Sequence, residues 1–249
     1  LDPLAGEWQR GRTLPARAVN DIVADQEIAN RAYAAVFLSN RWSIFMTTDG
    51  GKSWQATLPP TDIDEGFFTF MQALEIGQHN GQSLLYAGSN HCGLVYSQDH
   101  GQSWQPFGHA TCTFKEDEPK DIRDIAADPH VDGRLFVAAD RNRVYRTTNG
   151  GASWSVAQLN ITGDITVLKV DPQIPNRLYL IAGSNGFWRS DDSGVHWDPY
   201  SQGLEEKALV DFTILPDPQQ ALIVAAETGE VWRTQNGGKQ WLSIKENLS

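Results

Sequence analysis

Five copies of an eight-residue pattern constrain the fold of this 249-residue chain more than any other feature of its sequence. Each copy reads Ser or Thr, any residue, Asp or Asn, any residue, Gly, any two residues and Trp. The copies lie at 47–54, 97–104, 147–154, 190–197 and 234–241, so successive tryptophans are 50, 50, 43 and 44 residues apart. A fixed period of about 20–50 residues is typical of repeat architectures, in which each repeat is one supersecondary unit.

The residue types in the pattern predict a tight turn between two strands. A glycine adopts positive φ at little cost, and an Asp or Asn side chain can accept main-chain N–H bonds within the turn. The tryptophan ring contributes a large packing surface. We therefore expect structural roles for the acids and amides and for the tryptophans, which are Asp49, Asp99, Asn149, Asp192, Asn236, Trp54, Trp104, Trp154, Trp197 and Trp241.

The pattern resembles the Asp-box, also called the BNR repeat, of sialidases, sortilin-type receptors, xyloglucan-degrading hydrolases and a photosystem II assembly-factor family. In those families the box forms the hairpin between the third and fourth strands of a propeller blade. The resemblance extends from about residue 18 to 244 and implies an all-β fold in a single domain. We expect a five-bladed β-propeller of four-stranded antiparallel blades, at approximately 18–58, 70–108, 121–159, 164–203 and 208–245.

Between the boxes, short apolar runs bounded by turn residues are typical of β-strands. We expect first strands at 19–24, 71–76, 122–127, 165–170 and 209–215, and second strands at 33–38, 84–87, 135–138, 178–182 and 222–225. Third strands are expected at 44–46, 94–96, 144–146, 187–189 and 231–233, and fourth strands begin at the box tryptophans. Three Asp-Pro pairs, at 128–129, 171–172 and 217–218, mark turns between first and second strands, since proline ends a strand ladder.

The N-terminus repeats part of a blade. Trp8-Gln9 followed by Leu14-Pro15 is similar to Trp54-Gln55 followed by Leu58-Pro59. The segment 1–15 is therefore predicted to act as an additional fourth strand that helps to close the ring.

Composition excludes some partners. The net charge of −11 argues against non-specific binding of nucleic acid or of anionic membranes, and it favours a basic partner or a cation. No apolar run approaches the roughly 18 residues of a membrane helix, so we expect no membrane insertion. The chain starts at Leu1 without a visible signal peptide, which is compatible with removal of a targeting segment.

The two longest connections between repeats are the strongest candidates for a binding surface, because long loops in compact domains are often functional. Residues 59–70 and 107–121 combine acids with aromatic rings, and the alternative is a solvated acidic rim. By the resemblance, the face opposite the boxes carries the ligand sites. The candidate binding residues are Arg41, Trp42, Asp62, Asp64, Glu65, Phe67, His91, His109, Phe114, Asp117, Glu118 and Arg141.

The two cysteines, Cys92 and Cys112, flank the second box hairpin. Their proximity predicts a disulfide and an oxidising compartment, so we expect a secreted or periplasmic protein. Two alternatives stay open: free thiols, or a zinc site that includes His91 and His109. We expect no cofactor and no metal.

Catalytic patterns are sparse. No sialidase arginine triad is visible, and no nucleophile elbow, P-loop or dinucleotide fingerprint occurs. Acidic loop residues could serve as the two carboxylates of a glycosidase, but any two acidic loops would look alike. The leading hypothesis is a non-catalytic binding or assembly module for a protein or glycan. The alternatives are a glycoside hydrolase, or one domain of it, and a protein similar to the photosystem assembly factors.

Overall fold

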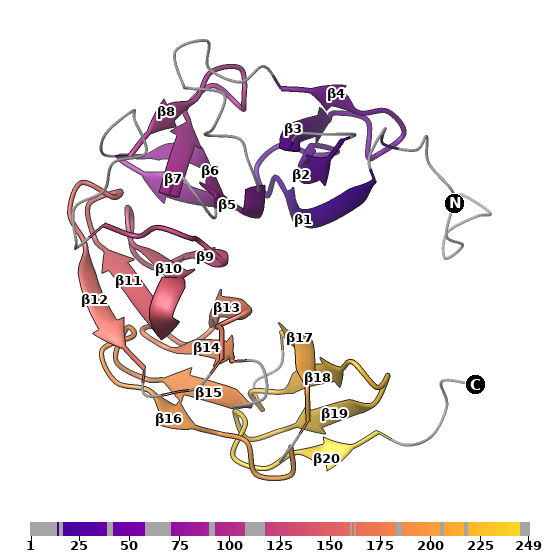
Figure 1. Ribbon diagram of the computed structural model, residues 1–249, viewed down its shortest axis with the longest axis vertical. Helices are drawn as coiled ribbons and strands as arrows, with labels where there is room; N and C mark the ends of the chain where they lie inside the picture. Colours follow the sequence, from indigo (N-terminus) through magenta and orange to yellow (C-terminus); the bar gives the residue numbers. More distant parts are fainter. Residues whose placement is uncertain are drawn as a thin grey trace.

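The chain is an all-β protein of five four-stranded antiparallel sheets arranged as the blades of a propeller, as predicted (Figure 1). The computed structural model describes residues 14, 17–38, 42–57, 71–89, 93–107, 118–159, 161, 163–182, 186–204, 207–216 and 219–244. Within each sheet the strands are paired in chain order, so every blade is a simple up-and-down meander.

The strands of the first three blades are as follows. Blade 1 consists of β1 (Ala18–Ala24), β2 (Ala32–Phe37), β3 (Trp42–Thr47) and β4 (Gln55–Ala56). Blade 2 consists of β5 (Met71–His79), β6 (Gln82–Ser89), β7 (Gly93–Ser97) and β8 (Gln105–Pro106). Blade 3 consists of β9 (Asp124–Ala127), β10 (Leu135–Ala139), the 3₁₀ turn η2 (Asp140–Asn142), β11 (Arg143–Thr147) and β12 (Ser155–Gln158).

Blades 4 and 5 repeat this plan. Blade 4 consists of β13 (Val167–Val170), β14 (Leu178–Ile181), β15 (Phe187–Ser190) and β16 (Asp198–Pro199). Blade 5 consists of β17 (Leu209–Ile214), β18 (Leu222–Ala226), β19 (Val231–Thr234) and β20 (Leu242–Ser243). Each fourth strand begins one residue after its box tryptophan, not at it as predicted, because the tryptophan belongs to the turn.

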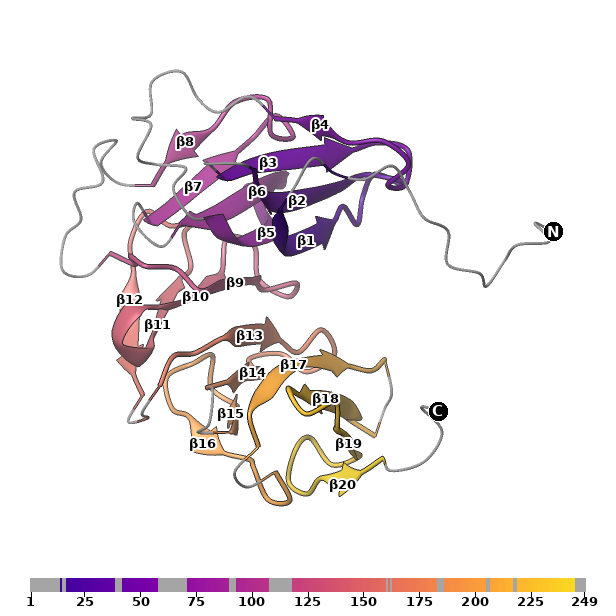
Figure 2. The same cartoon turned by 45° about the vertical axis from the view of Figure 1, so that its right-hand side comes forward.

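The blades follow one another around an arc, with the first strand of each blade innermost and the fourth outermost (Figure 1). The two ends of the arc, β1 and β17, stand apart in both views (Figures 1 and 2). Most of the segment 1–15, which was predicted to close the ring, lies outside the described residues. Its one described residue, Leu14, packs on the buried cluster of Ala34, Val36 and Phe45 in blade 1.

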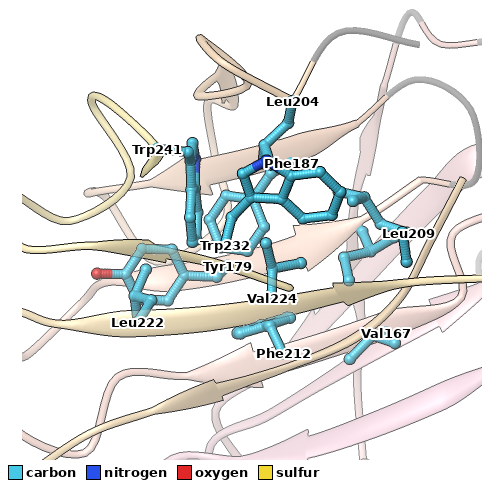
Figure 3. Close-up of a cluster of buried hydrophobic side chains, with 12 residues drawn as sticks. Val167, Tyr179, Phe187, Leu204, Leu209, Phe212, Leu222, Val224, Trp232 and Trp241 are labelled. Carbon is cyan, nitrogen blue, oxygen red and sulfur yellow. The ribbon is translucent and has the colours of Figure 1, made fainter. Parts of the chain in front are cut away.

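The hydrophobic core lies between adjacent blades. Between blades 4 and 5, Phe187 meets Trp241 at 5.0 Å and Phe212 at 5.0 Å between ring centroids, both edge-on (Figure 3). The box tryptophans differ in burial: Trp104 and Trp241 are each 3% exposed, whereas the rings of boxes 1, 3 and 4 are only half-buried. The five box rings are therefore not equally buried.

Blade 2 departs from its expected length. Its first hairpin extends to His79 and Gln82, beyond the predicted strands, because Asn80 and Gly81 form a two-residue turn in which both residues have positive φ. This extension carries His79 to blade 3, where it meets the turn between β9 and β10.

Candidate functional site

The same hydrogen bonds hold all five Asp-box turns, numbered here box 1 (47–54) to box 5 (234–241) in chain order. In box 1, Thr47 Oγ1 donates to Asp49 Oδ1 over 2.8 Å and accepts the Gly51 N–H, and Asp49 Oδ1 accepts the Ser53 N–H over 2.9 Å. Box 3 repeats these bonds with Thr147, Asn149 and Ser153. The acid or amide of the box is thus fully engaged within its turn.

Bonding inside the turn also sets the ionisation of the box carboxylates. Hydrogen bonds from the Ser53 hydroxyl and main chain lower the pKa of Asp49 to about 2. For Asp192, partial burial acts in the opposite direction, but the hydrogen bonds from His196 and Ser190 together outweigh it and lower the pKa to about 2. These carboxylates are therefore ionised acceptors and have no proton to donate in catalysis near neutral pH.

Box 3 is wedged against blade 2. An added Cβ at Gly150 would lie 2.5 Å from the ring of His79, and one at Gly151 would lie 2.6 Å from the ring of Phe107. Real Cβ atoms do not approach other heavy atoms so closely, so a larger residue at either position would have to displace the neighbouring ring. Phe107 is itself held by Tyr96, with 4.5 Å between ring centroids.

A groove of about 730 Å³ runs along this junction of blades 2 and 3. Its blade 2 wall combines the rings of Tyr96 and Phe107 with the amide of Gln98. The opposite wall is box 3, from Asn149 to Trp154, and Glu118 lies at the connection between the blades. Ligand sites are typically concave and combine aromatic surface with a few polar groups, and this groove has that composition.

Carboxylates on the inner strands form a second group of polar residues, around the propeller axis. Asp21 Oδ2 accepts the N–H of Leu74 in the next blade over 2.6 Å, and Asp124 Oδ2 accepts the N–H of Leu168 over 2.6 Å. Glu75 lies on β5 and accepts the N–H of Ile76. These bonds fasten one inner strand to the next or hold the strand itself, so they are structural contacts.

Burial dominates the ionisation of these inner-strand acids. It raises the pKa of Asp124 to about 7 and that of Glu75 to about 8, against the opposing effect of their main-chain hydrogen bonds. Burial also raises the pKa of Asp21, and the charges of Lys169 and Asp211 act on the same carboxyl in opposite directions. Among the residues that the structure describes, no group of three or more His, Cys, Asp or Glu is placed to hold a metal ion.

Few of the predicted binding residues can be placed. Trp42 is buried at 9% exposure and packs on Phe37, so it is part of the blade 1 core. Glu118 lines the groove, and the backbone of Arg141 lies in η2. The others lie outside the described residues, as do both cysteines of the predicted disulfide; they are Arg41, Asp62, Asp64, Glu65, Phe67, His91, Cys92, His109, Cys112, Phe114 and Asp117.

Sequence reasoning missed most of the groove. Phe107 and Glu118 belong to the predicted binding loop 107–121, but Tyr96 lies on a predicted third strand, and the other wall is a box that resembles its four copies. One local signal was present: Asn80-Gly81 predicts a tight hairpin that projects from blade 2. The inner acids also had a signal, since Asp21 and Asp124 each directly precede the apolar run that ends a predicted first strand.

Comparison with known proteins supports the repeat and the fold. A model of the BNR/Asp-box repeat matches residues 95–106, which include all of box 2. No curated protein matches the sequence. Many solved structures match, and together with the five four-stranded sheets they show a β-propeller fold.

Two kinds of solved structure are similar to this chain. The GH74 xyloglucanase of Xanthomonas campestris matches with a TM-score of 0.70 and 16% identity, over 92% of this chain and 38% of the enzyme. YCF48 of Cyanidioschyzon merolae matches with a TM-score of 0.62 and 15% identity, over 93% of this chain and 72% of that protein. A structure described as YCF48 bound to D1 peptide matches with a TM-score of 0.58 and 18% identity, over 86% and 63%.

These likenesses show the fold, since identities near 16% carry no residue-level correspondence. The chain spans less than two fifths of the length of the GH74 enzymes that it matches. In the described part of the chain, no helix is long and apolar enough to cross a membrane.

Proposed function

We propose that this protein is a binding module whose groove between blades 2 and 3 takes an extended segment of a partner protein. The groove itself is the observation that carries the proposal. It is about 730 Å³ in volume and combines aromatic rings with amide side chains on one wall and a main-chain turn on the other. Such a surface can pack against a peptide and also hydrogen-bond its main chain.

The charge of the chain favours a basic partner. The net charge is −11, which attracts positively charged segments and speeds their encounter. Glu118 lines the groove and places one acid at the site. A similar propeller has been solved with a bound peptide, which supports a peptide as the ligand of this fold.

Ala152 offers a direct test of the groove. It is exposed and lines the groove, and Lys52 is the exposed residue at the matching position of box 1, which is not among the groove residues. A bulky ring at Ala152 therefore fills the groove, whereas the same ring at Lys52 does not. Both substitutions lie at turn positions that accept several residue types in the other boxes.

The experiment is a fluorescence anisotropy screen of the whole chain against 12-residue peptides of positive, zero and negative net charge, with xyloglucan oligosaccharides in parallel. We expect positively charged peptides to bind, with at least a tenfold loss of affinity in Ala152→Trp and no change in Lys52→Trp. Equal losses in both variants would place the binding surface elsewhere. Binding of the oligosaccharides alone, abolished by Ala152→Trp, would show that the groove is a glycan site.

The predicted disulfide belongs to the same proposal, because it would fix the loops that follow β6 and precede blade 3. We infer that Cys92 and Cys112 pair and that the protein works in an oxidising compartment. Intact mass of the non-reduced protein should be two hydrogens below the reduced value. Two alkylatable thiols, or bound zinc, would contradict the pairing.

A further inference from the structure

One face of blade 5 lacks the partner that the same face has in the other blades. In blade 3, the face toward blade 4 includes Phe136, Ala138 and Val144, which are at most 1% exposed. By strand register the matching residues of blade 5 are Ile223, Ala225 and Val231, and all three are partly exposed. In the bulge of β17, Val210 is 43% exposed.

The first strand of blade 5 also carries an aspartate that, in blades 1 and 3, accepts an N–H from the next blade; in blade 5 this partner is missing. Asp21, Asp124 and Asp211 lie at the same register position in their blades. In each blade, one residue of the first strand is level, across the second strand, with the first residue of the box, and the aspartate lies three residues before it. In each of them Oδ1 accepts the N–H of the following residue.

The second carboxylate oxygen of this aspartate reaches the next blade. For Asp21 and Asp124 it accepts a leucine N–H over 2.6 Å. Among the described residues, Oδ2 of Asp211 accepts no hydrogen bond, and the side chain is 65% exposed. Lys169 Nζ, in blade 4, donates to Oδ1 of Asp211 over 2.7 Å.

The aspartate is present in alternate blades. Blades 2 and 4 have Ala73 and Val167 at the register position of the aspartate. With no acid of their own there, their next N–H groups are free to donate to the preceding blade, as Leu74 and Leu168 do. A blade that carries the aspartate satisfies that N–H internally.

Blade 1 is therefore a poor partner for blade 5. The Ile22 N–H, which would have to reach Asp211, already donates to Asp21 Oδ1 over 2.8 Å. The charge of Asp211 is also among the influences that raise the pKa of Asp21, after burial, so the two carboxylates repel. In agreement, β1 and β17 stand apart at the ends of the arc (Figures 1 and 2).

We propose that the exposed face of blade 5 docks a further four-stranded Asp-box blade of the type represented by blades 2 and 4, with Asp211 accepting a main-chain N–H of its first strand. The occupant is a blade because the same interface is already present between blades 3 and 4, and blade 5 presents the matching apolar face and the matching acid. A blade that carries its own aspartate does not complete this contact.

The test appends a blade to the whole chain. One variant carries a second copy of residues 164–203 (blade 4) after residue 249, and its matched control carries a second copy of residues 121–159 (blade 3). We expect the blade 4 copy to raise the melting temperature by at least about 3 °C and to protect the amides of β17 from hydrogen exchange. The blade 3 copy should do neither. In an Asp211→Ala background, measured against Asp211→Ala without an added blade, the blade 4 copy should give no gain.

Four results would overturn the proposal. Equal gains from both copies would show an unspecific apolar face. A gain that survives Asp211→Ala would show that the carboxylate is not the docking group. A parent chain that sediments as a dimer, with β17 amides protected on dimer formation, would show that a second copy of this chain occupies the face. An appended blade 4 whose amides stay unprotected counts as failure to dock.

Discussion

Box 1 and box 3 are nearly the same turn in different surroundings. Both hold a Thr hydroxyl, an acid or amide and a glycine N–H in the same hydrogen bonds. Box 1 has room around it: an added Cβ at Gly50 would lie 3.4 Å from its nearest neighbour, Asn30. Box 3 packs tightly against blade 2, and an added Cβ at Gly150 would lie only 2.5 Å from the ring of His79. The repeated residues therefore determine the hydrogen bonds of the turn, whereas the neighbouring blade determines how much room surrounds it.

The largest effect should come from replacing these matched glycines. Their φ angles are +71° and +67°, so the strain of adding a Cβ is equal, about 1–2 kcal/mol. Gly150→Ala must also displace His79, which adds about 1–3 kcal/mol of overpacking. Urea unfolding should show Gly150→Ala as clearly less stable than Gly50→Ala. Equal losses would mean that the blade 2 contact with box 3 contributes nothing.

The inner strands add a pH dependence near neutral pH, whereas the box carboxylates titrate only in acid. The pKa of Glu75 rises from 4.5 unfolded to about 8 folded, so folding favours the protonated form. This stabilisation is full below pH 4.5 and declines as the pH rises to about 8. Asp124 acts in the same direction, from 3.8 to about 7. We expect the urea midpoint to fall between pH 5 and pH 8, and to fall less in Glu75→Gln.

An identical pH slope in wild type and Glu75→Gln would remove Glu75 as a source of this dependence. Far-UV circular dichroism at both pH values serves as the control that the variant retains the wild-type fold.

The smallest expected effect on stability comes from the charge difference between the two boxes. Asp49 in box 1 has a pKa of about 2, whereas Asn149 in box 3 does not titrate. The stability from Asp49 is present above pH 3.8 and is lost as the pH falls toward 2. Asp49→Asn should therefore give box 1 the acid resistance of box 3. The check is thermal melting at pH 3 and pH 6, and a variant with undiminished acid sensitivity would contradict it.

The five-blade fold could be predicted because the boxes repeat the residues that form their own turns: Gly51 and its copies supply positive φ, and Asp49 and its copies accept the turn N–H groups. The groove could not be predicted in the same way. Phe107 and Trp154 are far apart in sequence and become neighbours only through blade packing. The alternation of Asp21, Asp124 and Asp211 depends likewise on strand register, which sequence spacing alone does not reveal.

Hydrogen–deuterium exchange of the whole chain, with and without a bound basic peptide, tests most directly whether the difference between box 3 and box 1 is functional. We expect slowed exchange in residues 93–107 and 147–154, which form the two walls of the groove, and no change in residues 47–54. Equal protection of both boxes, or protection that leaves residues 147–154 unchanged, would contradict a binding site between blades 2 and 3.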